Sequence, residues 1–159
     1  MYINKNFFVL KLSKKTDYAI ILLTHLGEFN APVSAQKIAA HYKLPYPMVA
    51  NILKILVSSG LIKSIRGQRG GYVLAKPAEK IILSEIIKVT DNPFTLVECV
   101  DDVALCKVQE CCPTKLTLIA LHRKIQRVIE ETTLASIVKD AQLVKPNFKD
   151  STYEIAHLS

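Results

Sequence analysis

Residues 47–75 read PMVANILKILVSSGLIKSIRGQRGGYVLA, and this segment predicts the fold of the chain. Its first half carries an apolar stripe at helical spacing and ends at Gly60, the residue type that most often stops a helix. The stripe consists of Val49, Ile52, Leu53 and Leu56. Two β-type runs, 61–65 and 72–75, then flank a turn that contains three of the five glycines in the chain. A helix followed directly by such a hairpin predicts a helix-turn-helix unit that carries a wing.

The residues before this segment supply the other helices that such a unit needs. Ser34 can cap a short helix that runs to about Tyr42. A break at 43–46 separates it from Pro47, which suits a first helical position because the missing N–H is not needed there. A longer amphipathic helix is predicted over 13–26, with a serine as its cap and a glycine directly after it.

The second helix of a helix-turn-helix unit packs one face on the core and presents the other to the major groove. The outward positions near its start are Pro47, Met48, Asn51 and Lys54. Asn51 can pair with adenine, Met48 can touch a thymine methyl group, and Lys54 suits a phosphate or guanine. The alternative is an ordinary solvent-exposed helix face.

The glycine-rich turn also carries two arginines, Arg66 and Arg69. In a winged helix such a tip lies along the DNA backbone or reaches into the minor groove. A phosphate-binding loop of a nucleotide enzyme is the competing interpretation. It requires a helix directly after the turn and a GKS or GKT motif, and the sequence after Gly71 contains neither.

The formal net charge of +7 is distributed unevenly along the chain. Residues 1–80 hold twelve Lys and Arg against three Asp and Glu, whereas residues 81–159 hold nine against eleven. A basic half joined to a slightly acidic half indicates a nucleic-acid-binding module attached to a sensing or pairing module. A solvated basic face without a partner is the alternative. No membrane span and no signal peptide are predicted, so we expect a cytoplasmic protein without membrane association.

All four cysteines lie within residues 99–112. They are Cys99, Cys106, Cys111 and Cys112. In a reducing cytoplasm such a cluster favours a metal or redox site over a disulfide framework. Cysteines buried as small apolar side chains are the alternative.

The spacing of these thiols bears on which metal they suit. Structural zinc usually uses paired CxxC knuckles, and this segment has none. The wider spacing of Cys99, Cys106 and Cys112 fits an iron-sulfur cluster better, because such clusters accept mixed ligation. Cys111 is unlike the other three, since two adjacent cysteines bind one iron only with strain. We interpret it as a spare thiol or as a resolving thiol for a redox disulfide.

The longest predicted helix starts at Pro113 and runs to about Thr132. It carries an apolar seam at spacings of three, four and three residues. The seam consists of Leu118, Leu121, Ile125 and Val128. Such a seam on a long C-terminal helix predicts a symmetric homodimer, and packing against its own domain is the alternative.

Three blocks of the chain together resemble the IscR/NsrR family of winged-helix regulators. They are LSKKTDYA at 12–19, the segment 60–75, and the three spaced cysteines, so the resemblance covers roughly residues 10–138. Within the family the chain is most similar to regulators of SUF iron-sulfur assembly operons. The resemblance implies a homodimer that binds palindromic double-stranded DNA operators, with a 2Fe-2S or 4Fe-4S cluster whose state changes DNA affinity.

The resemblance also implies roles for single residues. Cys99, Cys106 and Cys112 take the positions of the cluster cysteines, and Met48, Asn51 and Arg66 fall where such regulators contact DNA. The gap from Cys99 to Cys106 is one residue longer than is usual in the family.

The fourth cluster ligand is a separate question. IscR-type members place a histidine three residues after the last cysteine, and this chain has Lys115 there. NsrR-type members use an aspartate of the first helix, donated by the other subunit, and Asp17 occupies that position. His122 and Glu98 are further candidates for the fourth ligand.

We therefore predict a mostly α fold with a small β-hairpin wing and a long C-terminal dimerisation helix. The expected division is an N-terminal extension (1–9), a winged helix-turn-helix domain (10–92), a cysteine loop (93–112), the dimerisation helix with a last turn (113–139) and a tail (140–159). The predicted function is that of a repressor for iron-sulfur cluster assembly or for a redox, nitric oxide or iron stress response. The alternative is a thiol-switch or zinc-stabilised winged-helix module that binds a protein partner without a cluster. An enzyme is not expected, because no nucleophile, base and oxyanion donor are brought together.

Overall fold

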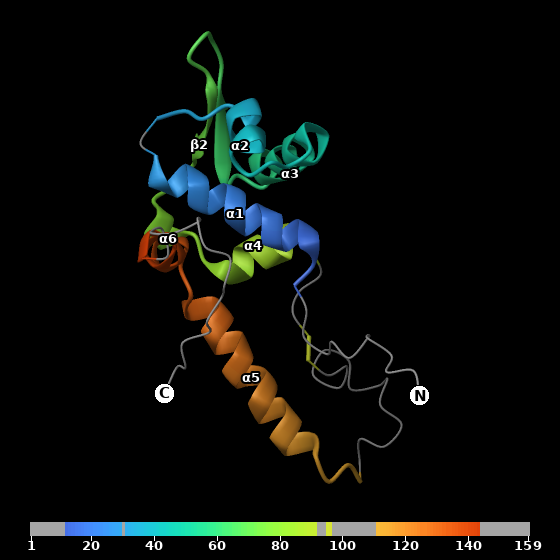
Figure 1. Ribbon diagram of the computed structural model, residues 1–159. Helices are drawn as coiled ribbons and strands as arrows, with labels where there is room; N and C mark the ends of the chain where they lie inside the picture. Colours follow the sequence, from blue (N-terminus) through green and yellow to red (C-terminus); the bar gives the residue numbers. More distant parts are fainter. Residues whose placement is uncertain (1–11, 30, 92–94, 97–110, 144–159) are drawn as a thin grey trace.

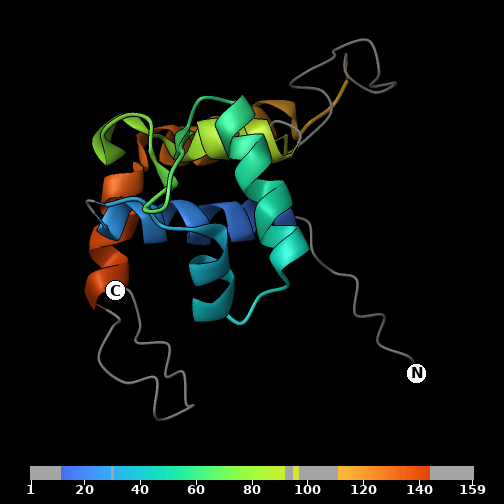
Figure 2. The ribbon, with the colours of Figure 1, turned by 90° about the horizontal axis from the view of Figure 1, so that it is seen from above.

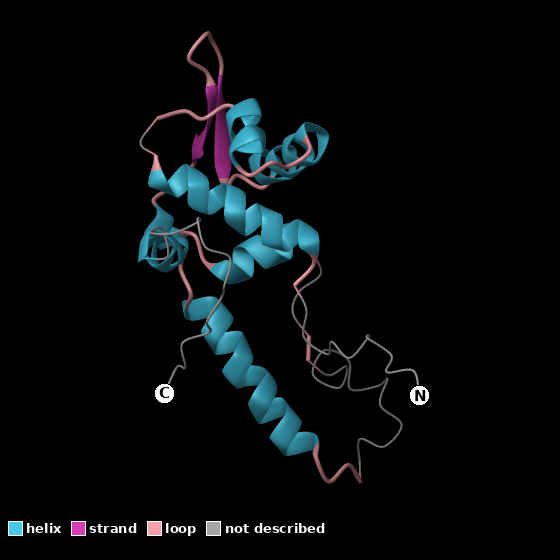
Figure 3. Cartoon of the chain, in the orientation of Figure 1, coloured by secondary structure: helices cyan, strands magenta, loops and turns pink. Residues whose placement is uncertain are grey.

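The computed structural model describes residues 12–29, 31–91, 95–96 and 111–143. Helices predominate over a single β-hairpin (Figure 3), which confirms the predicted fold class. The elements in chain order are α1 (Lys14–Glu28), α2 (Ala35–His41), α3 (Tyr46–Ser58), β1 (Ile62–Ile65), β2 (Gly71–Leu74), the 3-10 helix η1 (Ala78–Lys80), α4 (Leu83–Thr90), α5 (Lys115–Glu131) and α6 (Leu134–Leu143). The predicted extension 1–9 lies outside the described residues.

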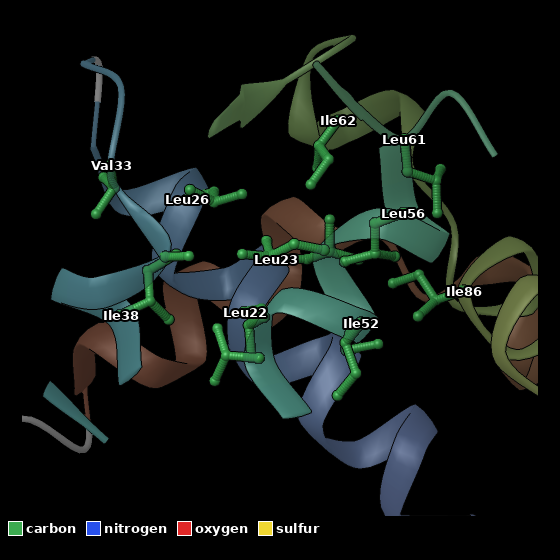
Figure 4. Close-up of a cluster of buried hydrophobic side chains, with 14 of the residues drawn as sticks. Leu22, Leu23, Leu26, Val33, Ile38, Ile52, Leu56, Leu61, Ile62 and Ile86 are labelled. Carbon is green, nitrogen blue, oxygen red and sulfur yellow. The ribbon is translucent and has the colours of Figure 1, made fainter. Parts of the chain in front are cut away.

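Helix α1 runs through the middle of the molecule, and α3, α4, α6 and β2 pack around it (Figure 1). Ser13 begins it as predicted, since the Ser13 hydroxyl oxygen accepts a hydrogen bond from the backbone N–H of Thr16 at 3.2 Å. Its inward side chains are fully buried against apolar residues from α2, α3, β1 and α4 (Figure 4). They include Ala19, Leu22, Leu23 and Leu26. Burial of this stripe makes α1 the helix on which the core is built.

The predicted helix-turn-helix pair is present as α2 and α3. Ser34 caps α2 as expected, and its hydroxyl oxygen accepts from the N–H of Lys37. Helix α3 begins one residue earlier than predicted, at Tyr46, with Pro45 as its N-cap, so Pro47 occupies the second helical position. The turn after α3 uses Gly60 at φ +76°, a conformation that costs glycine little.

The wing is an antiparallel pair of strands in which Ile62 lies opposite Leu74 and Ile65 opposite Gly71. Val33, in the segment between α1 and α2, forms an isolated antiparallel β-bridge with Tyr72 of β2. Val33 donates its N–H to the carbonyl oxygen of Tyr72 at 3.1 Å and accepts the Tyr72 N–H at 2.9 Å. This bridge ties the base of the wing to the start of the helix-turn-helix unit.

Helix α4 is not capped by Ser84, although serine is a residue type that commonly caps helices. The helix begins at Leu83, and the N-cap Ile82 donates its N–H to the Glu85 carboxylate. The N–H of Leu83 is used elsewhere, since it donates to the Thr132 carbonyl oxygen at 2.8 Å. The Leu134 N–H donates in turn to the Ile81 carbonyl oxygen at 2.7 Å, so backbone pairing joins the start of α4 to the junction of α5 and α6.

Helix α6 crosses the C-terminal part of α1 (Figure 2). Close approach is possible because Gly27 has no side chain, and a Cβ added there would lie 2.9 Å from Val138 Cγ2. Thr133 caps α6, and the Thr133 hydroxyl oxygen accepts the Ser136 N–H. The helix continues to Leu143, beyond residue 140 where we expected the tail to begin. Residues 144–159 of that tail lie outside the described residues.

Helix α5 projects away from the rest of the molecule (Figure 1). It begins at Lys115, two residues later than the predicted start at Pro113. The predicted seam divides into two pairs: Leu118 and Ile125 are half-buried, whereas Leu121 and Val128 are 45% and 64% exposed. Within the described residues no helix combines the length and the apolar character needed to cross a membrane.

Candidate DNA-binding surface and metal centre

The solvent face of α3 carries the side chains that the sequence analysis assigned to DNA. Pro47, Asn51 and Lys54 are exposed, while Met48 is half-buried and packs partly against the core. The opposite face holds the predicted inward stripe, with every member 2% exposed or less. Asn51 and Lys54 line a shallow hollow of about 420 Å³ together with Val89 from α4. The helix therefore presents an amide and an ammonium group at its surface, as the recognition helix of a helix-turn-helix unit requires.

Both predicted wing arginines, Arg66 and Arg69, are exposed in the turn between β1 and β2. The turn uses Gly67 at φ +116°, and Gly70 lies so close to the backbone of Ile65 and Gly67 that a Cβ would collide there. Glycine suits Gly67 because of the positive φ there, and it is required at Gly70 because of the close backbone approach. The glycines therefore shape the tip that presents the two guanidinium groups.

The wing and α3 are on the same side of the molecule. In Figure 1 the wing, α2 and α3 all lie above α1, and α5 extends below it. Helix α3 and the wing thus share one side of α1, although they are separated in sequence. This arrangement lets a helix enter a groove while the hairpin reaches a neighbouring part of a duplex.

The structure adds one exposed group that the sequence analysis did not assign to this surface. Tyr46 is 48% exposed at the first turn of α3. Its phenol can donate a hydrogen bond to a phosphate oxygen. The signal was available in the sequence, since an aromatic residue directly before Pro47 lies at the helix start. The sequence pattern places Tyr46 in the break at 43–46 instead.

The predicted metal ligands are only partly within the described residues. Cys99, Cys106 and the alternative ligand Glu98 lie outside them. Cys112 and Asp17 are described: Cys112 is half-buried just before α5, and Asp17 is exposed in the first turn of α1. In Figure 1 these two places in one chain are well separated. Among the residues that the structure describes, no three side chains of the metal-binding types gather into one group.

Cys112 lies in an environment that favours its thiolate. Its sulfur is 3.5 Å from the Thr114 hydroxyl oxygen. The pKa of the Cys112 thiol is lowered chiefly by the hydrogen bond from the Thr114 side chain, then by backbone N–H groups and the charge of Lys115, with partial desolvation opposing them. A thiolate is the form that binds a metal and the form that attacks a disulfide. The neighbouring Cys111 is exposed.

His122, considered above as a fourth ligand, is engaged in a different contact. It is 4% exposed on the inner face of α5, and its Nδ1 accepts a hydrogen bond from the backbone N–H of Leu96 at 3.3 Å. An accepting Nδ1 places the ring proton on Nε2, so neither nitrogen has a lone pair ready for a metal in this tautomer. Lys115, which replaces the histidine of IscR-type members, is the first residue of α5.

Three comparisons with known proteins agree on the class. Residues 12–140 match the sequence pattern of the Rrf2 family, described as "Iron-dependent Transcriptional regulator". The transcriptional regulator NsrR of Oceanobacillus iheyensis is 29% identical over 136 residues, covering 84% of this chain and 92% of that protein.

Two solved structures have the same fold and comparable identity. CymR, the global cysteine regulator of B. subtilis, has a TM-score of 0.69 at 28% identity and covers 82% of this chain and 98% of its own. IscR of T. potens has a TM-score of 0.66 at 28% identity and covers 87% of this chain and 93% of its own. These relatives are regulators and not enzymes, in agreement with the prediction from sequence.

Proposed function

Since the chain belongs to the Rrf2 family of transcriptional regulators, we propose that it is a homodimeric repressor whose binding to a palindromic DNA operator is controlled by an iron-sulfur cluster. The observation that carries the DNA part of this proposal is that α3 and the wing lie on one side of α1 and that Asn51, Lys54 and Arg66, which these elements carry, are all exposed. We retain residues 10–92 as the DNA-binding domain, 93–112 as the cysteine loop and 113–139 as the main pairing segment.

The proposed DNA contacts divide between base reading and backbone binding. Asn51 and Met48 contact base edges in the major groove, because their amide and thioether groups match adenine and the thymine methyl group. Arg66 and Arg69 bind the backbone or the minor groove at the wing, and Lys54 neutralises a phosphate. Pro47, the second residue of α3, lies at the edge of the groove. Binding then weakens steeply with salt, because condensed counterions are released from the duplex.

The proposed dimer uses α5. Two members of its predicted seam, Leu121 and Val128, are exposed, and because they lie seven residues apart they share one face of the helix. Exposed apolar residues in a row along one long helix are unfavourable in water unless a partner covers them. A second copy of the same helix is the simplest partner, since an isologous contact covers both faces at once. Pairing also spaces two α3 helices for the half-sites of a palindrome.

The proposed cluster site combines Cys99, Cys106 and Cys112 with Asp17 of the partner subunit. The donor set suits an iron-sulfur cluster, because three cysteines and a carboxylate form a mixed ligand set, the lowered pKa of Cys112 favours its thiolate, and Asp17 is exposed at the molecular surface. The separation of Asp17 from Cys112 within one chain supports donation across the dimer. A bound cluster supplies a centre that oxygen, nitric oxide or iron supply can alter. Asp17 of one subunit and the thiolates of the cysteine loop of the other would hold the cluster between them, and this link would favour one arrangement of the two α3 helices.

The biological setting that fits this chemistry is control of iron-sulfur cluster assembly, with SUF-type operons as the first targets to examine. A response to nitric oxide, iron or oxidative stress uses the same chemistry. We place the protein in the cytoplasm, where its operator DNA lies.

The test combines metal analysis with operator binding. Protein purified without oxygen is expected to be brown and to bind the promoter region of its own gene in a fluorescence anisotropy assay. Asn51→Ala and Arg66→Ala are each expected to weaken binding by about tenfold, or about 1.4 kcal/mol. Lys139→Ala is the charge control, because Lys139 is exposed on α6. If both Asn51→Ala and Arg66→Ala bind like wild type, the proposed docking is wrong.

A second candidate function is a thiol switch without a cluster. The Cys112 thiol has a lowered pKa and the adjacent Cys111 is exposed, which is a suitable pair for oxidation chemistry. Native mass spectrometry separates iron-sulfur, zinc and disulfide forms by their added masses. A colourless, iron-free protein that still binds its operator normally would favour the thiol switch and remove the cluster from the mechanism.

A further inference from the structure

A chain of hydroxyl groups connects the first turn of α1 to the last turn of α4. Thr16 Oγ1 lies 2.8 Å from Thr90 Oγ1, and Ser13 Oγ lies 3.1 Å from Thr16 Oγ1. Thr90 Oγ1 in turn donates to the carbonyl oxygen of Ile86 at 2.7 Å. Thr16 is completely buried and Thr90 is 1% exposed, so water does not compete for these contacts. The two threonines are far apart in sequence but meet in the interior.

Each hydroxyl can donate only one proton, and this limit determines which group donates in each of these hydrogen bonds. Thr90 donates its proton to the Ile86 carbonyl, so its oxygen accepts from Thr16. The Thr16 oxygen then accepts from Ser13, whose own oxygen accepts the Thr16 backbone N–H. In this arrangement each of the three hydroxyl groups, those of Ser13, Thr16 and Thr90, takes part in a hydrogen bond. Removing only the Thr90 hydroxyl breaks the buried hydrogen bond that joins α1 to α4, and the Thr16 proton can then be accepted only within its own turn, by Ser13 Oγ.

The hydrogen-bonded hydroxyl groups lie next to Asp17, the proposed cluster ligand. Asp17 directly follows Thr16 in the same turn, and its backbone N–H donates to the Ser13 carbonyl oxygen at 3.0 Å. Helix ends fray unless side chains satisfy their open backbone groups. The Ser13 cap and the contact from Thr16 to α4 therefore hold the turn that carries Asp17 against the body of the domain.

We propose that Thr16 and Thr90 are positioning residues that fix the first turn of α1, and with it the carboxylate of Asp17, for cluster binding across the dimer. The inference rests on the proposed function of Asp17 as a ligand. The threonines touch no metal themselves. They act by keeping the Asp17 turn folded in one orientation on α4, and their alignment raises the affinity of the site for iron.

The central variant is Thr90→Val, which keeps the shape of the side chain and removes its hydroxyl. Cluster-loaded dimers prepared without oxygen are mixed with an iron chelator, and iron loss is followed by absorbance. We expect Thr90→Val to lose iron about tenfold faster than wild type, as the loss of one buried hydrogen bond predicts. Thr90→Ser, which keeps the hydroxyl, is expected to restore the wild-type rate.

A second readout uses the metal-free protein. Amide hydrogen exchange at Thr16 and Asp17 is expected to accelerate in Thr90→Val, because these amides are protected by bonds to Ser13. Thr24→Val is the matched control. Thr24 is also buried in α1, and its hydroxyl oxygen has no hydrogen-bond partner among the described residues, so its loss is expected to change neither readout.

The double variant Thr16→Val with Thr90→Val separates positioning from stability. It leaves no unpaired hydroxyl between the helices, so its unfolding midpoint is expected to return toward wild type while iron loss stays fast. If Thr90→Val lowers stability but leaves iron loss and exchange at Asp17 unchanged, the two threonines are purely structural and the inference is wrong.

The Asp17→Ala variant tests the underlying proposal separately. Faster iron loss in Asp17→Ala together with wild-type behaviour of Thr90→Val would overturn only the positioning role. Wild-type iron retention in Asp17→Ala would overturn the ligand role of Asp17 itself, and with it the proposed function of this turn.

Discussion

The ammonium nitrogen of Lys76 lies 2.8 Å and 2.9 Å from the two carboxylate oxygens of Glu85. Lys76 lies two residues after the end of β2, and Glu85 lies in the first turn of α4. The ion pair therefore joins the base of the wing to the body of the domain. Glu85 also accepts the backbone N–H of Ile82 at the start of α4. One carboxylate therefore supports both the wing and the helix end.

This double role predicts unequal costs for the two partners. Both side chains are about one third exposed, so solvent screens the ion pair, and Lys76→Met is expected to lower the free energy of unfolding by about 0.5 kcal/mol. Glu85→Ala also removes the cap and is expected to cost about 1 to 1.5 kcal/mol. Urea denaturation measures both values. A larger loss for Lys76→Met than for Glu85→Ala would contradict the proposed capping role.

Gly71 is expected to tolerate no side chain, because a Cβ there would lie 2.6 Å from the backbone of Val33. Gly71→Ala must separate the bridge between Val33 and Tyr72 and is expected to cost roughly 2 kcal/mol or more. Gly60→Ala is the control: the space around Gly60 is open, and only its positive φ opposes the substitution, at about 1 kcal/mol. Thermal unfolding and backbone amide shifts of Val33 distinguish the two effects. Equal costs would argue against steric exclusion at Gly71.

The Cys112 thiol is expected to react at lower pH than an ordinary cysteine. The Thr114 hydroxyl is the largest cause of its lowered pKa, so Thr114→Val raises the pKa and shifts the midpoint of the alkylation rate against pH upward. The measurement uses iodoacetamide and mass spectrometry on reduced, metal-free protein carrying Cys111→Ser. Identical pH profiles with and without Thr114→Val would show that the hydroxyl has no part in stabilising the thiolate.

Charges placed on the uncovered flank of α5 are expected to separate the subunits. Leu121→Asp with Val128→Asp puts carboxylates where the proposed interface is apolar, so sedimentation equilibrium should show monomers at concentrations where wild type is a dimer. Operator affinity falls with it, since two half-sites are no longer bound together. Leu143→Asp is the control, because Leu143 is 72% exposed on α6. A dimer that persists in the double variant would place the interface elsewhere.

Helix positions were predictable from sequence because their signals are local. The stripe from Val49 to Leu56, the caps at Ser13 and Ser34 and the glycines of the wing all act within a few residues, and the structure contains each of them. Asn51 and Arg66 could be assigned to the surface for the same reason, since the inward stripe and the turn determine which side chains remain outside. Their contacts with DNA remain predictions.

The remaining features depend on partners that lie far away in the chain. Ser84 does not cap α4, because the Leu83 N–H donates to the Thr132 carbonyl oxygen and the Glu85 carboxylate accepts the N–H of Ile82 at the helix start. Met48 is half-buried because the packing of α3 on the core covers part of it, which helical periodicity does not show. The sequence offers His122 as a candidate ligand, but in the structure its Nδ1 accepts a hydrogen bond from the backbone N–H of Leu96.

The sequence by itself determined the order of the elements, the wing and the chemical groups available for DNA and metal, because periodicity, caps and turns are encoded over short distances. Only the tertiary structure decided how those groups are held. Thr16 meets Thr90, Val33 meets Tyr72, and Lys76 meets Glu85 through contacts that form when separate elements pack. Such contacts leave no local pattern, since burial and hydrogen bonding across elements depend on the whole fold.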